Sequence, residues 1–87
     1  MYINHKQQEL IDEFFNLVKE KYPEIEFEDL QESPDYPGNI WINVVADMDD
    51  ERRSEMREFA IDHAIEIYDN YGYLFSLMHS NKTSRAA

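Results

Sequence analysis

The chain contains no cysteine, and this absence removes several kinds of chemistry at once. Without thiols there is no disulfide, no thiolate nucleophile and no cysteine zinc site, which fits a reducing compartment. The longest apolar runs are short and interrupted by charge, so neither a membrane span nor a signal peptide is expected. The sequence therefore predicts a cytoplasmic protein with no membrane contact, and no cofactor motif is recognisable in it.

Basic residues are also scarce, since eight lysines and arginines stand against 19 acids and give a formal net charge of −11. Such a charge repels phosphate backbones and anionic membranes, so direct nucleic-acid binding is not expected. Hydrophobic residues still make up 43% of the chain and aromatic residues 14%, which separates it from disordered sequences. Its 87 residues suffice for one domain with one core.

Residues 4–22 have the pattern of an amphipathic helix. Asn4 can cap the helix, and Gln7 can complete a capping box. Pro23 ends the helix, because proline disfavours helical geometry in the residue before it. Apolar residues recur at three- and four-residue steps and predict the buried stripe Leu10, Ile11, Phe14, Val18 and Tyr22, flanked by Phe15 and Leu17.

Two strands and a long hairpin connection are predicted next. Residues 24–28 alternate with period two, so Ile25 and Phe27 should face the core. Leu30 has the opposite parity, which predicts either a bulge near Asp29 or the end of the strand. Residues 33–39 are typical of turns. Residues 40–46 are β-branched and almost wholly apolar, as expected of a central strand.

A second helix is predicted to begin among the carboxylates of residues 47–51, with Asp49 or Asp50 as its cap. Gly72 is a candidate left-handed cap at its end, and residues 73–79 have the pattern of a last strand. The inward positions of the helix are Met56, Phe59, Ala60, His63, Ala64 and Ile67, with Ile61 and Ile65 on the flanks. We expect residues 1–80 to form a single domain and residues 81–87 a disordered tail.

The predicted fold is α+β, with the order α-β-β-α-β and a three-stranded mixed sheet covered by two helices on one face. A right-handed crossover should make the last two strands parallel. The other face would then carry an apolar patch. It would comprise Trp41, Val45 and either the pair Leu74 and Met78 or the set Tyr73, Phe75 and Leu77. We therefore expect a homodimer or a bound partner at this face or at an open edge strand.

Residues 38–47 read GNIWINVVAD and residues 71–77 read YGYLFSL. Together with the element order, these stretches resemble the minimal nucleotidyltransferase domains of bacterial toxin–antitoxin systems, over about residues 33–80. Members of that family carry a Gly-Ser pair after the first strand and an Asp-x-Asp on the second. Their carboxylates hold the magnesium ions that bridge nucleotide phosphates.

The present sequence departs from that family at every metal position. Glu32 and Ser33 stand where the Gly-Ser pair would be, and Asn39 and Trp41 stand where the two aspartates would be. The third carboxylate of the family would fall near Ser76. The resemblance therefore implies a degenerate domain that keeps the fold and lacks both the metal site and the catalysis.

The acids are concentrated in residues 22–51, where ten occur without one lysine or arginine. One interpretation is a docking surface for a basic protein, or a mimic of nucleic acid that inhibits a basic nucleic-acid-binding protein. The alternative is a set of solvated strand edges and a helix N-terminus. Two aromatic residues could anchor a partner, although Tyr36 could instead pack on Trp41 or a helix. The candidate partner-binding residues are Glu24, Glu26, Glu28, Asp29, Glu32, Asp35, Tyr36 and Trp41.

The preferred hypothesis is thus a non-catalytic acidic interaction domain with an unidentified protein partner. The enzyme alternative uses His63 or His79 with nearby carboxylates, although His63 also suits a hydrogen-bonded place in the core. No metal site is predicted, because helix capping explains the carboxylates of residues 47–51 more simply than calcium binding does. Exposed ion pairs are expected between Arg52, Arg53 and Arg57 and the neighbouring Glu51, Glu55 and Glu58.

Overall fold

The structure, a computed structural model, describes residues 2–80. Its order α-β-β-α-β confirms the predicted α+β class, and the tail predicted at residues 81–87 lies outside the described residues. The elements are α1 (His5–Lys21), β1 (Glu26–Glu32), β2 (Asn39–Val45), α2 (Asp50–Tyr71) and β3 (Leu74–Ser80).

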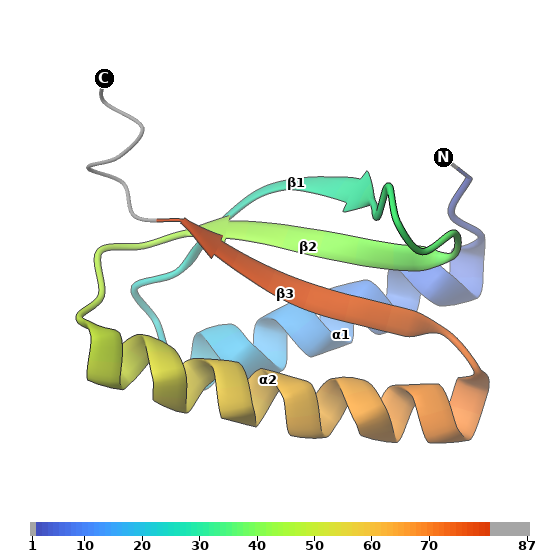
Figure 1. Cartoon of the computed structure of the whole chain (residues 1–87). Coiled ribbons are helices and arrows are strands. Elements are labelled where there is room, and N and C mark those ends of the chain that lie inside the picture. The colour runs from blue at the N-terminus through green and yellow to red at the C-terminus, as the bar shows by residue number, and fades with distance from the viewer. Residues whose placement is uncertain (1, 81–87) are drawn as a thin grey trace.

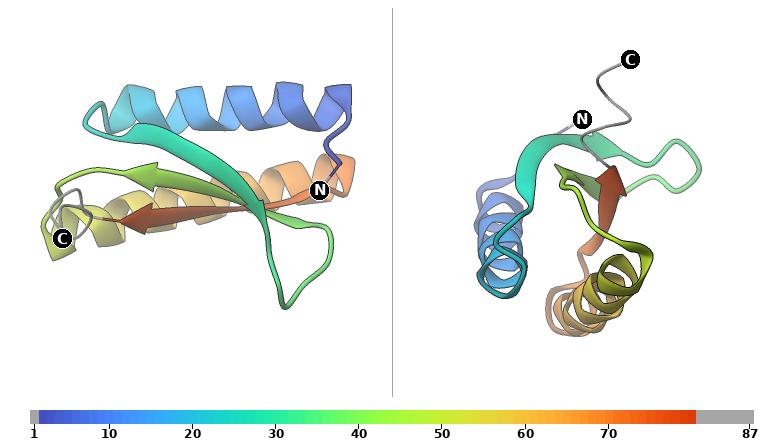
Figure 2. Two further views of the ribbon diagram at one scale, coloured as in Figure 1. Left: turned by 90° about the horizontal axis from the view of Figure 1, so that it is seen from above. Right: turned by 90° about the vertical axis from the view of Figure 1, so that its left-hand side faces the viewer.

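The three strands form one sheet in the order β1-β2-β3. Strand β1 is antiparallel to β2, and β2 is parallel to β3, as the crossover through α2 requires. Both helices cover the same face of the sheet, so that residues 2–80 form two layers and leave the other sheet face open (Figures 1 and 2). The predicted mixed sheet with two helices on one side is confirmed.

Both helices begin and end at the residues that the capping patterns predict. The Asn4 side chain accepts a hydrogen bond from the Gln7 backbone at 2.7 Å, and the Gln7 side chain accepts one from the Asn4 backbone at 3.0 Å. At the start of α2, Asp49 accepts a hydrogen bond from the Arg52 backbone at 2.8 Å. Gly72 ends α2 with φ = 77°, a left-handed conformation that glycine adopts without steric cost.

The core lies between the helices and the sheet and is built from hydrophobic side chains, including the ring of Tyr22. From β2, alternate residues point to the helices, so Ile40, Ile42 and Val44 are buried. Ala60 and Ala64 are the small residues where α2 meets this layer. The remaining core residues are Leu10, Ile11, Phe14, Val18, Tyr22, Ile25, Ala46, Met56 and Phe75. Neither helix has both the length and the apolar character needed to cross a membrane, within the described residues.

A bulge in β1 decides which of its side chains face the core. The pairing register shifts between Phe27, opposite Val44, and Asp29, opposite Asn43. Leu30 thereby returns to the helix side, which confirms the first of the two predicted alternatives. The same shift puts Asp29 on the open face of the sheet.

Candidate functional site

The open face of the sheet is centred on Trp41 of β2. Trp41 is partly buried and lies between two core-facing neighbours, so its side chain points away from the helices. The strand register places Gln31 of β1 on one side of it and Ser76 of β3 on the other. The indole is therefore flanked by polar side chains on both neighbouring strands.

Polar side chains bridge the strands on either side of this indole. The Asn43 amide donates a hydrogen bond to the Asp29 carboxylate at 2.7 Å, which joins β2 to β1. The Ser76 hydroxyl donates to the Asn39 side-chain carbonyl at 3.3 Å, which joins β3 to β2. These cross-strand contacts hold the surroundings of Trp41 in place and leave a face that carries hydrogen-bonding groups.

The apolar patch on this face is smaller than predicted. Val45, expected to point outward, is only 8% exposed. In β3 the outward set is Leu74 and Met78, because Phe75 pairs with Ile40 and is buried. The alternation of a strand predicts which side chains share a face, but it does not predict which residues of the neighbouring strands lie beside them. On this face Ser76 lies opposite Trp41, and Asn43 lies opposite Met78, so polar residues separate the apolar ones.

The hairpin loop between β1 and β2 presents a second aromatic residue. Its backbone is closed by hydrogen bonds from Ser33 to Asn39 at 2.8 Å and from Asn39 to Tyr36 at 3.0 Å. Gly38 permits the turn with φ = 91°. Tyr36 is 64% exposed, so it does not pack down on the domain. The loop projects from the rest of the molecule (Figure 2).

Carboxylates line the edge of the sheet next to this loop. Strand β1 is one of the two edge strands, and its predicted site residues Glu26, Glu28, Asp29 and Glu32 are exposed. Asp35 continues the series in the exposed part of the loop. Seven of the eight predicted partner-binding residues thus belong to β1, to β2 or to the loop between them. Asp29 and Trp41 lie on the open face of the sheet, whereas Glu32 is opposite the core-facing Ile40.

Glu24 is the exception, because Arg52 of α2 holds its carboxylate. The guanidinium donates from both Nε and Nη2 to the two carboxylate oxygens, the latter bond measuring 3.0 Å. This hydrogen bonding lowers the pKa of Glu24. The guanidinium also lies 4.7 Å from the ring centre of Tyr22. Glu24 thus fastens the chain before β1 to α2.

The ion pairs of Arg52 and Arg53 differ from the predicted ones. Arg52 pairs with Glu24, 28 positions away in sequence, and Arg53 pairs with Asp50 at 2.7 Å. Glu55 is engaged elsewhere, since it accepts a hydrogen bond from the buried Tyr22 hydroxyl at 2.8 Å. Burial and this contact raise the pKa of Tyr22 to about 12, so the phenol stays neutral.

A dependence of stability on pH follows from the lowered pKa of Glu24. The pKa of Glu24 is lower in the folded protein than in the unfolded chain, where glutamate has its ordinary value of 4.5. The ion pair therefore stabilises the fold fully above pH 4.5, and this stabilisation is lost as the pH falls through the folded-state pKa. In urea unfolding, Glu24→Gln should therefore be less stable than the wild type near neutral pH. The difference should shrink in acid. The exposed Glu20→Gln serves as the matched control, and an equal Glu24→Gln deficit at both pH values would contradict the ion pair.

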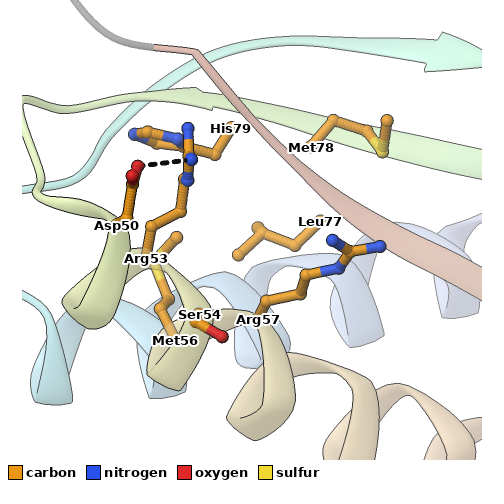
Figure 3. Close-up of a pocket in the computed structure, with 8 residues that line it drawn as sticks. All are labelled: Asp50, Arg53, Ser54, Met56, Arg57, Leu77, Met78 and His79. Carbon is orange, nitrogen blue, oxygen red and sulfur yellow. Dashed lines mark hydrogen bonds and ion pairs between the residues drawn. The ribbon is translucent and has the colours of Figure 1, made fainter.

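His79 lines a cavity of about 520 Å³ between β3 and the first turns of α2 (Figure 3). Its Nε2 lies 2.9 Å from the carbonyl oxygen of Ala46. The nearby Asp50 carboxylate accepts its hydrogen bond from Arg53, toward which it points in Figure 3. The hydrogen-bond partner of His79 Nε2 is thus a backbone carbonyl, whereas the enzyme alternative would pair a histidine with a carboxylate.

His63 is half-buried on α2 against the ring of Phe59, with the ring centres 4.5 Å apart. The hydrogen bond expected of a core histidine is not formed within the described part of the chain. No group of three or more histidine, aspartate or glutamate side chains there is arranged to hold a metal ion. The carboxylate of Asp49 caps α2, as predicted.

The three positions that the nucleotidyltransferase resemblance singles out lie together on the open face. Asn39, Trp41 and Ser76 belong to the adjacent strands β2 and β3, and none of them offers a carboxylate. Comparison of the chain with protein-family models, with curated proteins and with solved structures found no match.

Proposed function

We propose that this chain is a non-catalytic interaction domain that binds an arginine- or lysine-rich segment of another protein. The binding surface, which we call the hairpin surface, comprises Glu28, Asp29, Glu32, Asp35, Tyr36 and Trp41. The observation that carries the proposal is the position of Trp41 on the open sheet face, next to an edge strand whose exposed side chains are mostly carboxylates.

The chemistry of the hairpin surface suits a cationic segment. A guanidinium can stack on an indole or phenol ring, which contributes roughly 0.5–2 kcal/mol per contact depending on burial. Carboxylates beside the ring can accept paired hydrogen bonds from the same guanidinium. The concentration of acids also raises the rate of encounter with a basic partner through long-range attraction. Aromatic and acidic groups on one surface therefore favour arginine over an apolar ligand.

The same proposal gives the nucleotidyltransferase-like resemblance a role. A degenerate domain of that kind would keep its sheet face as a binding surface after losing its metal ligands. The side chains of Asn39, Trp41 and Ser76 supply an amide, an indole and a hydroxyl there, groups that can bind a peptide but include none of the carboxylates by which the family holds magnesium. A reducing cytoplasm suits a chain without cysteine.

Trp41 provides the test, because it is the only tryptophan of the chain and reports directly on the hairpin surface. Titration with an arginine-rich peptide should change the fluorescence of Trp41 in a saturable way, and added salt should weaken the binding. A peptide of the same length with glutamine in place of arginine is the control and should have no effect. Binding of the basic peptide without any change at Trp41 would reject the proposed surface.

A further inference from the structure

Strand β3 is the second edge of the sheet and differs from β1 in its charge. No other strand of residues 2–80 pairs with its outer side, so its backbone N–H and C=O groups are available there. Its sequence LFSLMHS contains no acid, lysine or arginine. In a chain with a net charge of −11, this is an edge that an acidic partner can approach.

An apolar groove of about 320 Å³ runs beside this edge, between β3 and α2. Ile61, Ile65 and Tyr68 of α2 line it and are 47%, 53% and 51% exposed, and Met78 of β3 is 39% exposed. Together these side chains leave on the order of 300–400 Å² of mostly apolar surface uncovered, as large as the largest patch of a typical monomer.

The distribution of charge favours a second copy of the chain as the partner that covers this groove and pairs with β3. Two copies of β1 cannot pair well, because their acids would meet across the axis. Two copies of β3 can pair antiparallel about Leu77, which places Ser76 opposite Met78 of the partner and brings no like charges together.

Arg57 adds complementary charge to the same surface. Among the α2 residues that line the groove, Arg57 is the first in the sequence. It makes no ion pair with any of the described residues. Across a two-fold axis the two α2 helices run antiparallel. Arg57 then approaches the later half of α2 in the second copy, where Asp62 and Asp69 border the apolar stripe.

We propose that the chain forms a homodimer in which two β3 strands pair antiparallel and the Ile61, Ile65 and Tyr68 stripes of the two α2 helices cover each other. The result is a continuous six-stranded sheet. The surface buried by the apolar stripe and by the paired strand of seven residues would approach roughly 800 Å² per partner, the area that a stable interface buries. An axis perpendicular to the sheet leaves both open faces on the same side, so the dimer presents two hairpin surfaces together. This assembly does not depend on what the hairpin surface binds.

The test measures the mass of the full chain in solution by sedimentation equilibrium. The wild type should form a species of twice 10.5 kDa at micromolar to millimolar concentration. Ile65→Glu should weaken the dimer by about 100-fold, because the axis brings the new carboxylate into the apolar interface twice. Leu17→Glu on α1 adds the same charge at a similarly exposed apolar position and should leave the dimer intact.

Amide hydrogen exchange supplies the second measurement and checks the strand pairing. Exchange along β3 should slow as the wild-type concentration rises and should be independent of concentration in Ile65→Glu, while β1 is unaffected in both. A wild type that remains monomeric at its highest soluble concentration would overturn the proposal, and another occupant would then have to cover the groove. A dimer that Ile65→Glu does not weaken would overturn it as well.

Discussion

Replacing Glu28, Glu32 and Asp35 together with lysine is expected to reduce the affinity for an arginine-rich peptide by about 100-fold at low ionic strength. Each replacement removes an attractive charge and adds a repulsive one on the edge strand β1 or on the loop that joins it to β2. The effect should fade as salt is added, because exposed charges are screened. Titration calorimetry at two salt concentrations measures both quantities.

A charge-matched triple on α1 separates a site from a general attraction between opposite charges. Glu9, Glu13 and Glu20 are exposed on the helix, away from the open sheet face. Their replacement with lysine changes the net charge from −11 to −5, as the first triple does. The α1 triple should retain most of the affinity. Equal losses in the two triples would mean that the peptide responds to net charge alone.

Truncation of Phe14 to alanine is expected to destabilise the domain by about 3–5 kcal/mol, the largest stability effect that we predict. The Phe14 side chain is 2% exposed and belongs to the core cluster between α1 and the sheet. Its loss would leave a cavity that the surrounding side chains fill only in part. Urea unfolding followed by circular dichroism gives the change in free energy.

Leu17→Ala on the same helix is the control for this truncation. Leu17 is 39% exposed, so its removal should cost less than about 1 kcal/mol while changing helix propensity in the same direction. A loss for Phe14→Ala as small as that for Leu17→Ala would contradict the packing of α1 against the sheet.

The local elements could be predicted because neighbouring residues in the sequence determine them. Asn4 and Gln7 form the predicted capping box, and Asp49 caps α2. Gly72 takes the left-handed conformation that ends the second helix. The β-branched and almost wholly apolar composition of residues 40–46 identified the central strand, in which Trp41 points away from the helices. The order of the elements and the crossover rule then led to the mixed sheet.

Features that depend on distant residues were beyond the sequence patterns. Arg52 selects Glu24 over its helical neighbours because the chain entering β1 passes beside the start of α2. This contact withdraws Glu24 from the predicted binding surface. Sequence patterns placed Ile61 and Ile65 only on the flanks of α2. They gave no sign that these two residues border an unpaired strand edge.

The proposed dimer would change how the hairpin surface works. Two surfaces on one side of a six-stranded sheet can engage two basic segments of the same partner, which raises the apparent affinity through effective concentration. Ile65→Glu separates the two effects, because it should remove this gain without changing how a single short peptide binds. A test of either proposal therefore remains informative if the other fails.

The most direct test of the hairpin surface is a map of backbone amide shifts in ¹H–¹⁵N spectra of the full chain, recorded as the arginine-rich peptide is added. The largest changes should fall in β1, in loop residues 33–38 and around Trp41 of β2, while α1 and the α2–β3 groove change little. Changes centred on α1 or on the groove, or spread evenly over the molecule, would contradict the proposed docking surface.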